Sequence, residues 1–291
     1  LNAFYGLRCG FPVPGVHDAC HSDVFVLYNG EKRSVEGGWH DAANLTQSPY
    51  RTHLSIYALL ELHDALKLRG RTSLAERALE EALWGLDWSV RTRFAPGLRA
   101  LYNHVSYWTD SKAGTADDVT QDDARSAVGR DDFQNILSVL AGARASRALR
   151  RSDPKLATGV LKAAREDFAL VAAAIQPPTD APPLEINQPS WRDFVGYATL
   201  AAVEMLRATG ESHFAEEASR LAKWLVATQE RSFVDGIGIA GYFYEDAGRT
   251  RIVHEYHNSF EDCGLLAFAA LCKALPDHPD WIEWFAGLAI Y

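Results

Sequence analysis

Two cysteines and three histidines lie close together near the start of the sequence. The segment RCGFPVPGVHDACHSD contains Cys9, His17, Cys20 and His21, and His40 follows in GGWHDAAN. Two thiolates and two imidazoles make a ligand set for tetrahedral zinc. The candidate ligands are Cys9, Cys20, His21 and His40, with His17 as an alternative fourth. The spacing Cys-x10-Cys-His-x18-His is not that of a zinc finger, and it leaves a Cys9–Cys20 disulfide or a chance cluster as competing interpretations.

The elements that must position these side chains are helices joined in pairs. Apolar residues recur at helical spacing, with Gly and Pro stops, over 52–70, 73–90, 131–151, 153–175, 190–210, 212–230, 259–276 and 278–291, after a helix fragment at 1–8. Ser73 is a candidate N-cap of the second of these helices. No βαβ alternation and no strand-rich block appears, so we predict an all-α fold of helical hairpins stacked in a solenoid or a closed ring. The long loops at 11–50, 92–130, 176–189 and 231–258 would then gather at one end.

Composition excludes several classes of function. The chain has 291 residues, a formal net charge of −9 and a pI of about 5.6, without a Lys/Arg run. A nucleic acid or an anionic membrane is therefore not an expected partner. No apolar run reaches the roughly 20 residues of a membrane span. Of the four cysteines, Cys263 and Cys272 lie nine residues apart on one apolar helical stretch, where we expect buried free thiols.

The segments FYGLRCG, VPGVHDACHSD and VEGGWHDAAN resemble the start of the catalytic module of family 9 glycoside hydrolases, the inverting cellulase family. The resemblance is greatest to members with an immunoglobulin-like domain ahead of that module. In the His-bearing members, two cysteines and two histidines bind a structural zinc. The resemblance therefore implies that Cys9, Cys20, His21 and His40 hold a zinc ion, which pins the entry loop over residues 1–50 and leaves no open position for substrate.

The resemblance also implies a fold and a domain organisation. The family fold is an (α/α)6 barrel of six helical hairpins, and we expect residues 1–291 to form one such module. Four complete hairpins fall short of six, and no match to the family's general acid appears before Tyr291. We therefore expect a ring incomplete at its C-terminus, taken from a longer chain with an immunoglobulin-like domain ahead. For an enzyme of this kind we expect a secreted or periplasmic location.

One catalytic position departs from the family pattern. The family turn continues as Gly-Gly-Trp-(Tyr/His)-Asp-Ala-Gly-Asp, in which the second Asp deprotonates the attacking water and the first supports it. Here Asp41 matches the supporting residue, Asn44 takes the place of the base, and Ala43 replaces the turn glycine. A neutral amide orients a water but cannot accept its proton. Asp41 is then a surrogate base, another loop supplies the base, or the chemistry differs or is lost. Hydrogen bonding within its own turn is the structural alternative for Asp41.

A second group of polar side chains lies in RIVHEYHNSFED, directly before an apolar helical pattern. Its members are His254, Glu255, Tyr256, His257, Asn258, Glu261 and Asp262. Such groups bind sugar hydroxyls, and a glutamate among them can act as a general acid. Capping of the next helix by Asn258 or Ser259 would explain only part of the group. Together with Asn44, the same histidine, tyrosine and asparagine side chains also fit a polysaccharide lyase that removes a proton beside a uronate carboxylate.

Aromatic side chains on the expected loops are candidate platforms for sugar rings. The candidate substrate-binding residues are Trp39, Tyr107, Trp108, Trp191, Tyr242 and Asn258. Five other tryptophans are expected in helix cores instead: Trp84, Trp88, Trp224, Trp281 and Trp284. The leading prediction is hydrolysis of a poly- or oligosaccharide with Asp41 and Glu255 as the working carboxylates. Uronate lyase chemistry is the second prediction, and a non-catalytic glycan-binding module is the third.

Overall fold

The computed structural model describes residues 1–17, 19–21, 24–40, 47–101, 127–176, 189–232, 239–253, 260 and 262–291. These residues form two compact units, Leu1–Leu170 and Val171–Tyr291. Helices dominate both units, which confirms the predicted all-α class. Within the described ranges, no helix combines the length and the apolar character that crossing a membrane requires. The prediction of one module over residues 1–291 stays a prediction.

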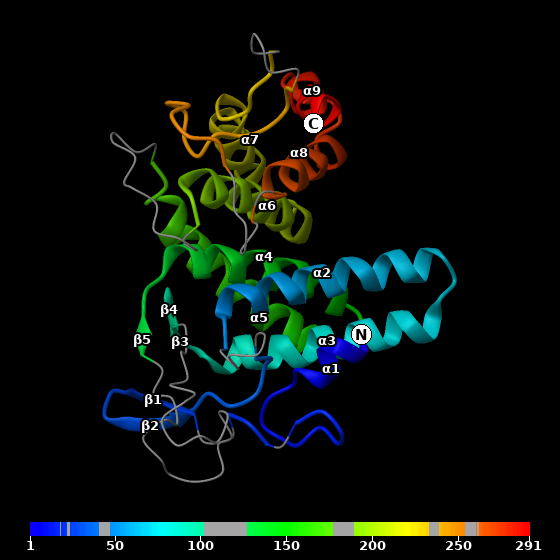
Figure 1. Cartoon of the computed structure of the whole chain (residues 1–291), viewed down its shortest axis with the longest axis vertical. Helices are drawn as coiled ribbons and strands as arrows, with labels where there is room; N and C mark the ends of the chain where they lie inside the picture. Colours follow the sequence, from blue (N-terminus) through cyan, green and yellow to red (C-terminus); the bar gives the residue numbers. More distant parts are fainter. Residues whose placement is uncertain are drawn as a thin grey trace. The chain divides into compact units, whose positions relative to one another are not determined.

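The first unit is built on two long helices that form an antiparallel hairpin, α2 (Pro49–Leu68) and α3 (Thr72–Arg91) (Figure 1). Ser48 caps α2 by accepting a hydrogen bond from the Arg51 N–H, and Pro49 occupies the first turn, where no amide donor is needed. The helix α3 begins at Thr72 after Arg71, without a side-chain cap. The prediction of Ser73 as the N-cap is therefore wrong, because the N-cap position is Arg71, two residues earlier, and Ser73 already lies inside the helix.

Helix α4 (Asp132–Leu149) packs against α2, and α5 (Pro154–Ala172) follows it after a short turn (Figure 1). The Asp131 carboxylate caps α4 by accepting from the Gln134 N–H at 2.9 Å. Almost every side chain of α4 is buried, so this helix is central to the unit. The core it shares includes Ile56 and Leu86, and burial of each such side chain contributes about 1.5–3 kcal/mol.

The second unit holds two further hairpins (Figure 1). In the first, α6 (Trp191–Thr209) begins with a reciprocal capping box between Ser190 and Asp193 and ends at Gly210, whose φ of 76° suits glycine. After Gly210 the chain turns at once into α7 (Ser212–Ala227). In the second, α8 (Cys263–Ala274) is followed by α9 (Trp281–Ile290), the last helix. These helices agree with the predicted ranges to within a few residues.

The described residues also form five short strands, which were not predicted. An antiparallel pair joins β1 (Phe25–Tyr28) to β2 (Glu31–Ser34), and a second small sheet has the order β3 (Arg93–Ala95), β4 (Leu98–Ala100), β5 (Val128–Gly129). The turn of the first pair is Asn29-Gly30, with φ values of 52° and 82°. Asn-Gly with both residues at positive φ is the strongest short-range hairpin signal, so this strand pair could have been found in the sequence.

A buried carboxylate ties the second small sheet to α5. Asp167 accepts hydrogen bonds from Arg93 at 2.8 Å, from Arg99 at 2.9 Å and from the Gly97 N–H at 2.8 Å. Burial alone would raise the pKa of Asp167, but the hydrogen bond from Arg93 and the charge of Arg99 outweigh it and hold this pKa below its ordinary value. The carboxylate therefore stays ionised and fixes the β3–β4 turn on the helix.

Candidate metal centre

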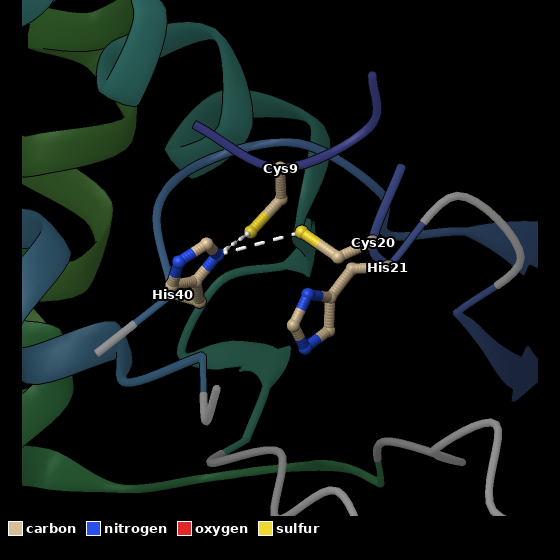
Figure 2. A group of neighbouring side chains, drawn as sticks. All are labelled: Cys9, Cys20, His21 and His40. Carbon is tan, nitrogen blue, oxygen red and sulfur yellow. Dashed lines mark hydrogen bonds between the residues drawn. The ribbon is translucent and has the colours of Figure 1, made fainter. Parts of the chain in front are cut away.

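Four buried side chains, those of Cys9, Cys20, His21 and His40, converge in the first unit (Figure 2). One ligand atom from each lies within 4.8 Å of the others. Cys9 follows the short helix α1 (Asn2–Gly6), and His40 follows a Gly-Gly-Trp turn. The structure thus brings together the four residues that the sequence singled out, in a group that could bind a metal. His17 is not part of this converging set, although its ring lies edge-on to that of His40 at 5.0 Å.

Backbone hydrogen bonds hold the ligand-bearing segments together. The Cys9 N–H donates to the Gly38 carbonyl at 3.0 Å, and the Gly10 N–H donates to the Cys20 carbonyl at 2.8 Å. The segment at residues 9 and 10 therefore lies between the segment at residue 38 and the segment at residue 20. Gly10 has a φ of 95°, a conformation that a residue with a Cβ adopts only with strain. The convergence of the side chains follows from this pairing of the main chain.

The glycine pair before Trp39 is needed because the turn packs tightly against α3. Gly37 and Gly38 have φ values of 90° and 70°. A Cβ on Gly38 would lie 2.9 Å from Cγ of Trp88, closer than side chains approach one another. At the end of the turn, the His40 N–H donates to the Leu7 carbonyl at 3.0 Å. The Gly-Gly-Trp turn is thus how the sequence places His40 against the start of the chain.

The electrostatics of the centre favour a thiolate. Nδ1 of His40 lies 3.4 Å from the sulfur of Cys9 and 3.4 Å from that of Cys20 (Figure 2). The hydrogen bond from Cys9 is the main cause that lowers the pKa of Cys20 far below its ordinary value, against the opposing effect of burial, and His40 adds to it. Burial raises the pKa of Cys9. The thiolate is the form of cysteine that binds metal ions.

The buried imidazole of His21 has polar atoms that a bound cation would satisfy. It is 1% exposed, and both of its ring nitrogens are buried without a hydrogen-bond partner in the part of the chain that the structure describes. Leaving a buried polar group unsatisfied costs about 1–3 kcal/mol. Its φ of 55° is unusual for a residue with a Cβ, and such strain concentrates at functional sites. A cation bound to one ring nitrogen would relieve this deficit, so the residues present fit a metal ion.

Most of the predicted catalytic and substrate-binding residues lie outside the described residues. These are Asp41, Asn44, Tyr107, Trp108, His254, Glu255, Tyr256, His257 and Asn258. Their predicted roles remain predictions. What the structure does fix is the position of His40, the residue directly before Asp41 in the chain.

Trp39 is not a sugar platform, and that prediction is wrong. Its side chain is 5% exposed and lies in the core of the first unit beside Ile56. The ring packs so closely on α3 that a Cβ on Gly85 would lie 2.2 Å from it. The ring of Phe4 meets it edge-on at 5.4 Å. The glycine in α3 makes room for the indole, and the close packing leaves neither face of the ring free for a sugar.

Trp191 and Tyr242 are half-buried in the second unit. The Trp191 Nε1–H donates to the Gln176 carbonyl at 3.0 Å, and its ring lies 6.0 Å from that of Trp224. The hydroxyl of Tyr242 lies 3.2 Å from that of Tyr244. Both side chains thus have partners within the protein, and their proposed contact with sugar stays a prediction.

Asp131 joins two helices through a hydrogen bond that was not predicted from the sequence. The Tyr50 hydroxyl, in the first turn of α2, donates to the Asp131 carboxylate, which also caps α4. Burial, followed by the charge of Asp131, raises the pKa of Tyr50 well above its ordinary value, so the hydroxyl keeps its proton and remains a donor. Asp131 directly before the apolar pattern of a helix was a capping signal in the sequence, but no sequence feature pointed to Tyr50 as its partner.

A family sequence model and several solved structures of the same family match this chain. The sequence model described as glycosyl hydrolase family 9 matches residues 1–265. No curated protein matches. Among solved structures, AaCel9A in complex with cellobiose-like isofagomine aligns with a TM-score of 0.67 at 19% identity, over 97% of this chain and 52% of that one. A metagenome-derived glycoside hydrolase family 9 endoglucanase aligns at 0.62 and 20% identity, over 99% and 63%. A Zn-binding triple mutant of the family 9 endoglucanase J30 aligns at 0.64 and 18% identity, over 99% and 53%.

At these identities the likeness shows the fold. The solved structures are (α/α)6 barrels, which confirms the predicted fold class. The chain spans 52% to 63% of the length of the three structures.

Proposed function

Because the chain belongs to glycosyl hydrolase family 9, we propose that it hydrolyses the glycosidic bonds of a poly- or oligosaccharide. The family match over residues 1–265 is the observation that carries this proposal. The matched solved structures include endoglucanases and an enzyme bound to a cellobiose-like inhibitor. A β-linked glucan is therefore the substrate class to test first. A secreted or periplasmic location and an N-terminal immunoglobulin-like domain belong to the same proposal.

The proposed chemistry needs two carboxyl groups on opposite sides of the bond. Inverting hydrolysis places them about 6.5–9.5 Å apart, with a water between them. We assign Asp41 as the supporting or surrogate base and Asn44 as the amide that orients the water. Glu255 is the candidate second carboxylate, and His254, Tyr256, His257 and Asn258 accompany it in the chain. Tyr107, Trp108, Trp191 and Tyr242 are the candidate sugar platforms.

We propose that the metal of the buried centre is zinc. Two cysteines and two histidines suit a closed tetrahedral site, which supplies structural stability and no open coordination position. The unpartnered ring of His21 and the stabilised thiolate of Cys20 support a cation there. A matched family 9 structure is a Zn-binding protein by name. Zinc held by His40 would anchor the residue next to Asp41, so the metal would act on the reaction by positioning the catalytic turn.

The other predicted functions have less support. Family membership does not favour uronate lyase chemistry. The non-catalytic glycan-binding module is favoured by one part of this proposal, the alignment of Asn44 with the family's base. Such a binder would keep affinity for the glycan and release no product.

A panel of polysaccharides assayed for two kinds of product tests the proposal. Hydrolysis creates reducing ends, whereas a lyase creates an unsaturated uronate that absorbs in the near ultraviolet. We expect reducing ends only, and we expect Asp41→Asn to lower the rate by about 10²-fold or more, as loss of a general base does. Full activity of Asp41→Asn would contradict the assignment of Asp41. No product from any glycan, with tryptophan fluorescence that responds to a glycan, would support the binding module instead.

A further inference from the structure

The two sulfurs of the metal centre are close enough to react with each other. Each lies 3.4 Å from the same atom, Nδ1 of His40, and the ligand atoms of the whole group lie within 4.8 Å of one another. Both cysteines are free thiols, and both are buried. A disulfide brings its sulfurs to about 2.05 Å.

The main chain around the two cysteines is already joined. The Gly10 N–H donates to the Cys20 carbonyl at 2.8 Å, so the residues that carry the sulfurs sit on directly hydrogen-bonded segments. Disulfides span Cα distances of about 4.4–6.8 Å, so the two cysteines must be carried on backbone segments that lie close together. The hydrogen bond between Gly10 and Cys20 brings these two segments together.

The two other cysteines are placed differently. Cys263 is buried at the start of α8, where its sulfur lies 3.1 Å from Nη1 of Arg192. Cys272 lies nine residues further along the same helix, and its sulfur is 4.0 Å from the Trp281 carbonyl. Because Cys263 and Cys272 are separated along one helix, they are not geometrically suited to a disulfide with each other. They serve as internal references for the selectivity of oxidation.

We propose that Cys9 and Cys20 form a disulfide when the metal is absent, as an alternative closure of the same loop. The oxidant is a low-molecular-weight disulfide such as oxidised glutathione. One thiolate attacks a glutathione sulfur and releases one reduced glutathione. The second thiolate attacks the mixed disulfide and releases the other. Two thiols thus lose two protons and two electrons, and one oxidised glutathione is reduced to two thiols.

The disulfide would replace only some of the links that a bound metal makes between segments of the chain. It ties residue 9 to residue 20, but it leaves His21 and His40 without a common partner. This part of the inference rests on the proposed function, because it links His40 to the catalytic turn through Asp41. A bound metal would protect both sulfurs, since their electron pairs are then shared with the cation. The oxidised chain is expected to keep its helices and to lose glycan hydrolysis.

The test treats the purified protein with oxidised glutathione before and after removal of metal by a chelator. In the metal-free protein we expect loss of two hydrogens in the intact mass, loss of two titratable thiols, and a cross-linked peptide pair that contains Cys9 and Cys20. Far-ultraviolet circular dichroism should be unchanged. Cys272→Ser should give the same cross-link, and Cys20→Ser should give none. The melting temperature of the oxidised metal-free protein should exceed that of its reduced form.

Stable glutathione adducts on Cys9 or Cys20 would overturn the proposal, and so would scrambled pairs that include Cys263 or Cys272. Retention of all four thiols would overturn it equally. The zinc-loaded protein separates this proposal from the zinc assignment. If that protein forms the Cys9–Cys20 cross-link as fast as the metal-free protein, zinc protection is wrong while the disulfide stands. If it resists oxidation and the metal-free protein forms only adducts, the zinc assignment stands and the disulfide is wrong.

Discussion

Asn44 is the residue on which the proposed chemistry depends most. In the proposed alignment with the family turn it takes the place of the general base, and its amide cannot take a proton from water. Asp41, three residues earlier, is the only residue of the GGWHDAAN turn with a carboxylate. The balance between these two residues determines whether the chain is a slow hydrolase, an enzyme with a surrogate base, or a binder.

Restoring a carboxylate at position 44 tests that balance. We expect Asn44→Asp to raise the hydrolysis rate on a responsive glycan by about 10²-fold, because a positioned general base contributes about 10²–10⁴. Reducing-end release under initial-rate conditions is the measurement. Asn44→Ala is the matched control and should show no gain. An Asn44→Asp protein that is folded and no faster than the wild type would show that the base lies on another loop.

Asp167 gives a stability prediction at the same scale. Replacing it by Asn leaves the buried guanidinium of Arg99 without its charge partner, which costs about 3–5 kcal/mol. Because the folded pKa of Asp167 is depressed, its stabilisation is fully present above the unfolded pKa and is lost as the pH falls through the folded pKa. The difference in unfolding free energy between wild type and Asp167→Asn, measured by denaturant, should therefore be largest near neutral pH and shrink in acid.

Glu166 provides the control for that measurement. It contacts Arg93 at 2.8 Å, but its side chain is 33% exposed. Glu166→Gln should change the unfolding free energy by less than about 1 kcal/mol. If the Glu166 and Asp167 variants lost the same unfolding free energy, burial would not be the reason why the ion pairs of Asp167 stabilise the fold.

At the scale of the element, the Gly-Gly-Trp turn connects the metal centre to α3. Gly38→Ala would bring a methyl group to 2.9 Å from the Trp88 ring, at a φ of 70° that also disfavours a Cβ. We expect a loss of about 2–3 kcal/mol in unfolding free energy, of which about 1 kcal/mol is backbone strain. Chemical denaturation and metal content should both report the change.

Gly15→Ala separates strain from contact. Gly15 has a φ of 78°, but nothing lies within 4 Å of the position that a Cβ would take. This variant should lose only the backbone contribution, about 1 kcal/mol. If Gly15→Ala and Gly38→Ala were equally destabilised, the packing of the turn against Trp88 would not be the reason for its glycines.

The helices were predictable because each carries a strong local signal. Apolar spacing located the helices α2 to α9 to within a few residues, and residues such as Gly210 marked their ends. The strands were not predicted because they are only two to four residues long, although the Asn29-Gly30 sequence indicates one of the turns. Trp39 was misjudged because its burial depends on Gly85, a residue 46 positions away on another element. Local patterns in the sequence carry no information about such a contact.

The convergence of the four candidate metal ligands was predictable from their residue types and not from helical periodicity. Four residues of metal-binding type within 32 positions restrict the possible sites even before any fold is known. Their choice over His17 depended on the family resemblance, and their geometry depends on backbone pairing between residues 9, 20 and 38, which spacing alone does not determine.

At the scale of the whole molecule, metal and stability should be linked. A ligand bound only by the folded chain raises its stability by mass action, by about 4 kcal/mol at a thousandfold excess over the dissociation constant. Treating the purified protein with a chelator in the presence of reductant should therefore lower the melting temperature by about 10 °C. Adding Zn²⁺ back should restore it. An unchanged melting temperature in protein shown to have lost its metal would mean that the centre does not support the fold.

The central claim is that a zinc ion bound by Cys9, Cys20, His21 and His40 holds the start of the chain against the catalytic turn. Elemental analysis of the purified wild-type protein, with the His21→Ala variant beside it, tests this most directly. The account predicts about one zinc per wild-type chain and a marked loss in the variant, as expected for a four-ligand structural site. Less than about half an equivalent in the folded wild type, or full occupancy in His21→Ala, would contradict it.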